Sequence, residues 1–363
     1  MQLKSVQALR GIAAVLVMLS HLHGVEARYS ETAPVLSSAW LFGVSGVDLF
    51  FVISGFIMVW VAGDLPARRA SAAEFFFARV CRIYPVWWLF AGAMALYFLF
   101  AYGVPWDAEM IERQGLSGLE HLFKSMLLIP HDAFPVLQLG WTLVHEIYFY
   151  FVFGLILLLP EKFRFQGFAL WALLIVASIL AQWTGSYANS LLGLALFPMT
   201  LEFLMGVGVG LLIKRGVRVF SRQALILGVI WLAIGAWMVD FSIASASLPT
   251  QRTIAFGPAF ALIVYGLVTL EQQEQIGDRI PLRLVTLGDW SYSLYLCHLL
   301  VISALARLFF PTFGTAGPID NIVFLIGSSA AAILVSGLAY THWERRVLAY
   351  TRKMRRRLFR AQP

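Results

Sequence analysis

Charged side chains are scarce in this chain. Only 13% of its 363 residues are Asp, Glu, Lys or Arg, whereas 60% are hydrophobic. A soluble domain has about 25% charged residues, because its surface must be wetted by water. The shortage of charge, together with apolar runs that recur along the whole chain, excludes a soluble globular fold. It predicts an all-α, polytopic membrane helix bundle.

Cysteine is equally rare. The chain has two, Cys81 and Cys297, of which one borders an apolar run and the other lies inside one, so we expect no disulfide framework. The first apolar run, from Val6 to Leu22, contains Arg10 and lacks a small-residue cleavage site. We therefore expect it to remain as a signal anchor.

Ten apolar runs are near the length that a bilayer requires. They cover residues 6–24, 42–62, 84–103, 139–159, 167–184, 191–213, 224–241, 254–271, 286–309 and 321–341. We expect residues 1–344 to form one transmembrane domain and residues 345–363 to form a basic cytoplasmic tail. The longest segment between runs, 104–138, contains an apolar stretch that could lie along the membrane surface.

The lysines and arginines predict the orientation. If the N-terminus is inside, 22 of the 27 fall in inner segments or in the tail. The outer segments contain Arg28, Arg113, Lys124, Arg252 and Arg307. This asymmetry predicts that both termini are cytoplasmic. Because the positive charges follow the membrane topology, the net charge of +7 does not indicate a nucleic-acid partner.

Charged and imidazole groups inside apolar runs are candidates for function, because each costs a few kcal/mol near the bilayer centre. Arg10 and His21 are eleven residues apart. On a helix, this spacing places both side chains on one face, within about 20° and roughly 16 Å apart. Arg10 alone could extend to the inner headgroups. The pair on one face favours a functional role.

Arg79 and Arg82 lie just before the third predicted span. Their spacing places two guanidinium groups on one helical face at the inner surface. Such a pair suits a phosphate-rich ligand, since guanidinium groups bind phosphate oxygens in bidentate fashion. Taken alone, the pair is better explained by membrane topology or by lipid headgroup binding.

His145 and Glu146 lie in the fourth predicted span and point some 100° apart, so we expect only one of them to face the interior. Glu146 is the stronger candidate, because a buried carboxylate is the more costly group; its alternative role is a structural hydrogen bond between helices. Tyr295 and His298 share a helical face. Core packing and site lining are equally compatible with that pattern.

The second predicted span has polar and small residues of its own. Gly46, Ser54 and Gly55 are interpreted as helix-packing residues. Asp48 is either structural or an acid that orients another group.

Five motifs occur in a fixed order along the chain. They are residues 7–11 with His21, 46–56, 79–85, 141–143 with Glu146 and 149–150, and 291–296 with His298. In this the chain resembles the membrane acyltransferase 3 family, in particular its exopolysaccharide O-acetyltransferase branch. It departs from the family at Glu344-Arg345-Arg346, where the family often has Glu-Arg-Pro, and this puts a local turn in doubt.

The resemblance implies a function and its residues. The family uses an acyl-CoA donor from the cytoplasm and a hydroxyl acceptor, usually on a polysaccharide or lipid-linked oligosaccharide, outside it. Arg10, His21 and Glu146 match the catalytic positions, and Arg79 and Arg82 match the donor-binding pair. Tyr295 and His298 are expected to contact the donor. We expect membrane lipid around the protein, a bacterial inner-membrane location and no metal ion.

These residues suggest a mechanism. A neutral His21 can take the proton of an attacking hydroxyl, with Glu146 orienting the imidazole. Alternatively His21 is itself acylated in a two-step transfer. Two other classes also fit a bundle with interior charges: a transporter or flippase of a lipid-linked glycan, and a non-catalytic assembly factor.

Overall fold

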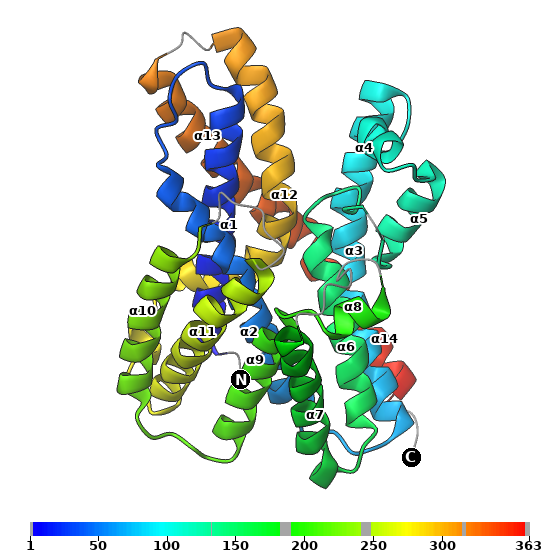
Figure 1. Ribbon diagram of the computed structural model, residues 1–363, viewed down its shortest axis with the longest axis vertical. Helices are drawn as coiled ribbons and strands as arrows, with labels where there is room; N and C mark the ends of the chain where they lie inside the picture. Colours follow the sequence, from blue (N-terminus) through cyan, green and yellow to red (C-terminus); the bar gives the residue numbers. More distant parts are fainter. Residues whose placement is uncertain (1–2, 132, 182–189, 241–247, 314–316, 360–363) are drawn as a thin grey trace. The chain divides into compact units, whose positions relative to one another are not determined.

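The computed structural model describes residues 3–131, 133–181, 190–240, 248–313 and 317–359. Within these ranges the protein is helical and has no β-strand, which confirms the all-α prediction (Figure 1). The helices are α1 (Lys4–Tyr29), η1 (Ser38–Ser45), α2 (Gly46–Ala62), α3 (Arg69–Tyr102), α4 (Ala108–Arg113), α5 (Gly118–Leu127), α6 (Gly140–Leu157), α7 (Glu161–Leu180), α8 (Leu191–Ala195), α9 (Thr200–Lys214), α10 (Ser221–Met238), α11 (Leu248–Gln272), η2 (Gly277–Arg279), α12 (Leu282–Phe313), α13 (Pro318–Ala339), η3 (Tyr340–Glu344) and α14 (Arg345–Phe359). Arg360 and the C-terminal ends of the predicted spans 167–184 and 224–241 lie outside the described residues.

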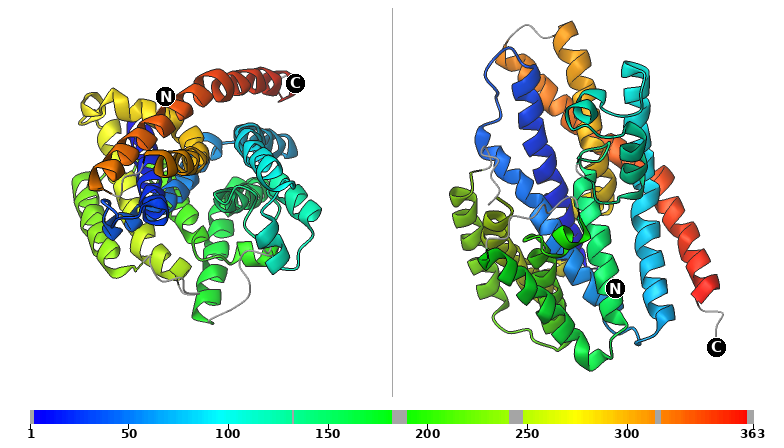
Figure 2. Two further views of the ribbon diagram at one scale, coloured as in Figure 1. Left: turned by 90° about the horizontal axis from the view of Figure 1, so that it is seen from above. Right: turned by 45° about the vertical axis from the view of Figure 1, so that its right-hand side comes forward.

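The chain forms two compact units. The first unit comprises Met1–Trp60 and Met205–Thr341, and the second comprises Val61–Leu204 and His342–Pro363. In the first unit α12 packs on α1 and α13, and α10 packs on α11. In the second unit α3 packs on α6 and α14, and Figure 2 shows α14 beside α3. The predicted division at residue 344 stays a prediction.

Nine helical segments of the described chain are long and apolar enough to cross a membrane. The prediction of one continuous span over 191–213 is wrong, because the chain forms α8 and then α9 with a break between them. Pro198 lies in that break. The residue before a proline is disfavoured in the α conformation, so the helix ends there.

Helices α1 and α12 run in the same direction, because Gly288 lies against Gln7 near the start of both and His298 contacts His21 further along both. Helix α9 has 15 residues and is not among the nine candidate spans of the described chain. The predicted number of ten crossings and the predicted cytoplasmic position of both termini stay predictions.

Two predicted boundaries change near the arginine pair and the tail. Helix α3 begins at Arg69 and continues through Pro85, so Arg79 and Arg82 lie inside a long helix and not before it. The tail is also helical: the π-helical turn η3 leads from α13 directly into α14. Arg346 stands where the family often has proline, and a proline would remove a backbone donor from this continuous helix.

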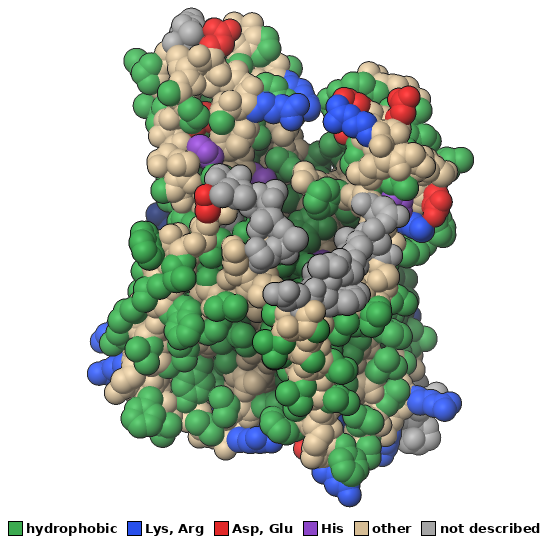
Figure 3. Space-filling model, viewed as in Figure 1, with side chains coloured by type: hydrophobic (Ala, Val, Ile, Leu, Met, Phe, Trp, Pro, Cys, Tyr) green, Lys and Arg blue, Asp and Glu red, His purple; other side chains and the backbone are tan. Residues whose placement is uncertain are grey.

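Buried and exposed faces agree with a membrane bundle. In the first unit, one hydrophobic cluster gathers residues of α1, α2 and α11, and another gathers residues of α1, α12 and α13. Figure 3 shows hydrophobic side chains over the outer surfaces of α7 and α10. Leu173 and Leu180 on α7 and Trp237 on α10 are exposed. Surfaces of this composition are suited to contact with lipid.

Arg164 does not have the purely topological role that charge counting gave it. Its side chain is buried and donates hydrogen bonds to the carbonyls of Leu157, Leu159, Gly63 and Leu65. Leu157 is the last residue of α6 and Leu159 follows it, whereas Gly63 and Leu65 follow the end of α2. Carbonyls at helix ends have no intrahelical partner. Arg164 therefore joins the ends of two helices.

Candidate active site

The site in the first unit begins with the close approach of α1 and α12. A Cβ atom added to Gly288 would lie 1.9 Å from the Gln7 carbonyl oxygen. Only glycine permits the two backbones to meet at this distance. This approach places the polar side chains at the start of α1 beside those of α12.

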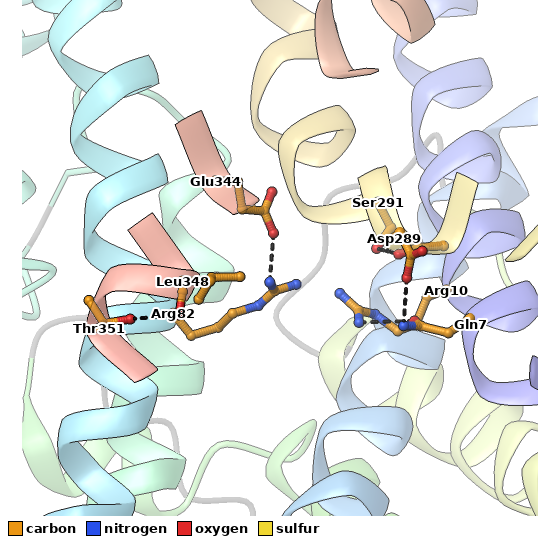
Figure 4. Close-up of polar contacts among 9 residues, drawn as sticks. Gln7, Arg10, Arg82, Asp289, Ser291, Glu344, Leu348 and Thr351 are labelled. Carbon is orange, nitrogen blue, oxygen red and sulfur yellow. Dashed lines mark hydrogen bonds and ion pairs between the residues drawn. The ribbon is translucent and has the colours of Figure 1, made fainter. Parts of the chain in front are cut away.

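Arg10 is positioned through that contact. The Gln7 amide Nε2 donates to Asp289 Oδ1 at 2.9 Å, and Arg10 Nη1 donates to Gln7 Oε1 at 3.2 Å (Figure 4). The carboxylate of α12 therefore orients the guanidinium group of α1 through one amide. Helix α1 is uninterrupted from Lys4 to Tyr29, which confirms the regular helix on which the predicted shared face of Arg10 and His21 depends.

His21 contacts a second histidine. His21 Nδ1 lies 3.2 Å from His298 Nε2 and 3.0 Å from the Val17 carbonyl oxygen. His298 Nδ1 in turn lies 2.9 Å from the Leu294 carbonyl oxygen. His298 is completely buried, whereas His21 is half-buried. The two rings are 5.1 Å apart and inclined at 46°.

These contacts determine the tautomers of two neutral rings. The Leu294 carbonyl only accepts hydrogen bonds, so His298 carries its proton on Nδ1 and presents an unprotonated Nε2. His21 Nδ1 then faces two acceptors, His298 Nε2 and the Val17 carbonyl, and must carry the proton of its own ring. The lone pair of His21 is consequently on Nε2, where it can act as a base.

Tyr295 completes this cluster. It is buried, and its ring lies 6.1 Å from that of His298 and 5.9 Å from that of Phe50. The predicted shared face of Tyr295 and His298 is confirmed. The predicted contact of Tyr295 and His298 with the donor stays a prediction.

Asp48 has a structural partner that the sequence did not reveal. Arg252 Nη2 lies 2.6 Å from Asp48 Oδ2, and both side chains are buried. The guanidinium charge of Arg252 neutralises the carboxylate charge of Asp48, which makes the burial of both side chains tolerable. Of the two roles considered for Asp48, the structural one therefore fits. Gly46 is confirmed as a packing residue, since an added Cβ would lie 2.4 Å from the Ala13 carbonyl oxygen.

A second polar cluster lies in the second unit. The Tyr150 hydroxyl donates a hydrogen bond to the Glu146 carboxylate one helical turn away on α6. The Arg79 guanidinium lies over the rings of Phe75 and Tyr150, at 5.8 and 5.9 Å, and interacts electrostatically with Glu146. Glu146 is thus associated with one of the predicted donor-binding arginines.

His145 takes the more buried of the two adjacent positions. Its ring stacks on Phe197 at 4.3 Å and 12°, and 8% of the residue is exposed, whereas Glu146 is half-buried. His145 is thus the more buried of the two, because an imidazole can stack on an aromatic ring and a carboxylate cannot. The choice of Glu146 as the candidate site residue stays a prediction.

Arg82 pairs with an acidic residue at the end of the π-helical turn. Its Nη1 lies 2.6 Å from Glu344 Oε1, and Glu344 is 1% exposed (Figure 4). Beside this pair, a partly open cavity of about 280 Å³ lies between α3 and α14. It is lined by Phe77, Ala78, Arg79, Cys81, Arg82, Leu348, Thr351, Arg352 and Arg355. Cationic groups around a cavity of this size suit phosphate groups.

The predicted site residues therefore fall into two groups. Arg10, His21 and His298 lie in the first unit, and Arg79 and Glu146 lie in the second. The predicted contact of Glu146 with His21 joins different units and stays a prediction. The sequence did not predict Gln7, Asp289 or Glu344 as site residues. Gln7 alone gave a local signal, since it precedes Arg10 by one helical turn.

Comparison with known proteins identifies the family of this chain. The family profile described as an acyltransferase domain matches residues 3–341. The chain is 31% identical to the exopolysaccharide production protein ExoZ of Rhizobium meliloti (strain 1021), over 86% of this chain and 92% of that protein. It is 27% identical to nodulation protein 10 of Rhizobium leguminosarum bv. viciae, over 83% of each. It is also 27% identical to the acyltransferase MdmB of Streptomyces mycarofaciens, over 94% of this chain and 90% of that protein. No solved structure matches.

The helical bundle and the family match define a multi-pass membrane acyltransferase. The chain belongs to the acyltransferase domain family, which covers almost all of the residues that the two units comprise. The resemblance inferred from the five motifs is thereby confirmed.

Proposed function

We propose that this enzyme transfers an acyl group, with acetyl the expected one, from cytoplasmic acyl-CoA to a hydroxyl of an extracytoplasmic or lipid-linked polysaccharide. The observation that carries the proposal is the contact of His21 with His298, which leaves His21 Nε2 as a base. The Rhizobium meliloti relative is an exopolysaccharide production protein, which supports a polysaccharide acceptor. The family and the apolar helices support a location in the bacterial inner membrane.

The residues of the chain divide the chemistry between them. His21 Nε2 takes the proton of the acceptor hydroxyl as the hydroxyl oxygen bonds to the thioester carbonyl carbon. When the carbon–sulfur bond breaks, His21 returns that proton to the departing thiolate. His298 keeps the proton of His21 on Nδ1 throughout. An acyl group held transiently on His21 is the alternative route.

Arg10 supplies a fixed positive charge on the same helix. It lies three turns before His21, roughly 16 Å away along α1, and Asp289 orients it through Gln7. Coenzyme A is a polyanion with a long thin arm, so we assign to Arg10 a place along the path of the donor. Arg79 and Arg82 fit the phosphates, because both line a cavity with further arginines.

The test is replacement of His21. His21→Ala should abolish acyl transfer while the protein still inserts and folds, because general-base catalysis contributes roughly 10²–10⁴-fold and has no substitute in alanine. Activity is measured as loss of thioester, and the product as the added acyl mass on the cell's exopolysaccharide. Folding is checked by the melting temperature of the purified variant. Full activity of His21→Ala would reject the proposed mechanism.

A transporter of lipid-linked glycan makes a different prediction. It needs no acyl donor and should tolerate His21→Ala. The family match already favours transfer. Mass analysis of the polysaccharide with and without the protein separates the two functions, because only the acyltransferase changes the acyl content.

A further inference from the structure

The face of α14 that packs on α3 carries charged residues where packing alone would place apolar ones. Leu348, Thr351, Arg352 and Arg355 all line the cavity with α3, and they recur at the spacing of a single helical face. Farther along this face, the Phe359 ring contacts the ring of Phe77 at 5.9 Å. The contact is therefore apolar at its end and cationic in its middle.

The acidic residues at this contact do not cancel the positive charge. Arg79, Arg82, Arg352 and Arg355 surround the cavity. Glu344 pairs with Arg82 at 2.6 Å, and Glu74 lies 3.6 Å from Arg355. Glu146 interacts electrostatically with Arg79. Three carboxylates against four guanidinium groups leave an excess of one positive charge around the cavity.

Arg79 has capacity for a further hydrogen bond. Its Nε atom is buried and, within the described chain, has no hydrogen-bond partner. A buried donor without a partner is unfavourable, and Arg79 is one of the residues that line the cavity. Guanidinium groups of separate helices around one cavity are suited to an anion with more than one phosphate.

We propose that α14 completes a phosphate-binding site with α3, in which Arg352 and Arg355 act together with Arg79 and Arg82 on the nucleotide phosphates of coenzyme A. This inference rests on the proposed function, which supplies acyl-CoA as the donor. The C-terminal helix is then part of the enzyme's donor site, in addition to any role of its charges in topology. Its other basic residues, such as Arg356 and Arg357, do not line the cavity.

The difference between the arginines of α14 that line the cavity and those that do not provides a matched control. Arg352→Gln with Arg355→Gln removes two charges that line the cavity, and Arg356→Gln with Arg357→Gln removes two exposed charges from the same helix. Binding of CoA is measured by calorimetry on the full chain in phosphatidylcholine nanodiscs. We expect the first variant to bind CoA roughly tenfold or more weakly, and the control to bind it within about twofold of the wild type. In the transfer reaction, KM for acyl-CoA should rise while kcat changes little.

The outcomes are distinguishable. Wild-type protein that binds no CoA would reject the proposed donor and therefore the proposed function. If the wild type binds CoA and the two double variants lose equal affinity, or neither loses any, only the role of α14 is rejected. The last outcome is seen in phosphatidylglycerol nanodiscs. If the variant with Arg352→Gln and Arg355→Gln retains less lipid than the wild type but binds CoA with unchanged affinity, the arginines form a lipid headgroup site and the role of α14 in CoA binding is rejected. Arg352→Gln alone, at an exposed position, serves if the double variant does not fold, and it should weaken CoA binding in the same direction.

Discussion

His21 Nδ1 lies 3.2 Å from His298 Nε2, although 277 residues separate them in the sequence. The contact joins α1 to α12 and gives His21 a fixed tautomer. A base must present its lone pair to the proton it removes. In the proposed mechanism the two histidines form one functional pair, with His21 as the base and His298 as the residue that positions it.

Replacing His298 tests this division of roles. His298→Leu removes one of the two acceptors of the His21 Nδ1 proton and leaves only the Val17 carbonyl, so the tautomer and the ring position of His21 are less firmly fixed. We expect kcat to fall by roughly 10–100-fold, less than for loss of the base itself, with KM for acyl-CoA little changed. His298→Gln keeps an acceptor oxygen and should recover part of the activity. Equal loss in both variants, or a rise in KM alone, would contradict a positioning role.

The buried ion pair of Asp48 with Arg252 should be important for stability. Arg252→Ala leaves the Asp48 carboxylate buried without its partner, which typically destabilises by about 3–5 kcal/mol. Asp48→Asn combined with Arg252→Gln leaves no buried charge and should be less damaging than either single change. Unfolding in detergent of Asp48→Asn, of Arg252→Gln and of the variant that combines them gives the coupling energy. Additive effects would show that the pair is not coupled.

These two pairs illustrate what the sequence could predict. Apolar runs and helical spacing are local, so they gave the spans and the shared face of Arg10 and His21. Arg252 and Asp48 are 204 residues apart, and spacing rules cannot match them. Charge counting placed Arg252 among the outer-segment cations, whereas its side chain is buried in an ion pair.

The break between α8 and α9 was missed for a different reason. Hydropathy reports apolar character, which remains high across Pro198, and it does not report helical continuity. The same limitation moved the predicted start of the third span to residue 84, because the part of α3 before that point contains charged side chains. The pairing of Glu344 with Arg82 required knowledge that the tail returns to α3.

His121, outside the membrane-spanning helices, predicts a pH effect. It is fully buried on α5, and burial, with a smaller contribution from nearby His131, lowers its pKa from 6.5 to about 4. Its neutral form is therefore favoured in the folded state. The contribution of neutral His121 to the free energy of unfolding is fully present above pH 6.5. It is lost as the pH falls towards 4, because only the unfolded state binds the proton readily in this range. A pKa difference of this size corresponds to about 3 kcal/mol.

The measurement is the melting temperature of the purified protein between pH 8 and pH 4.5. His121→Phe should reduce the decrease below pH 6.5, since the variant has no proton to bind at that position. Other groups also titrate in this range, so the comparison is between the slopes of the two proteins. Identical slopes would show that the burial of His121 has no effect on acid stability.

The close approach of α1 and α12 depends on Gly288. Gly288→Ala places a methyl group against the Gln7 carbonyl oxygen, where an added Cβ would lie at 1.9 Å. The helices must separate, which we expect to destabilise the protein by about 1–3 kcal/mol and to weaken the contact of Gln7 with Asp289 that orients Arg10.

Gly327→Ala is the matched control, because that glycine lies in α13 with no atom within 4 Å of an added Cβ. An alanine there should be neutral or stabilising by about 0.5–1 kcal/mol, since glycine inside a helix is unfavourable. Thermal unfolding and transfer activity are measured for both variants. Equal melting temperatures and equal activities of Gly288→Ala and Gly327→Ala would show that α1 and α12 need not touch at this point.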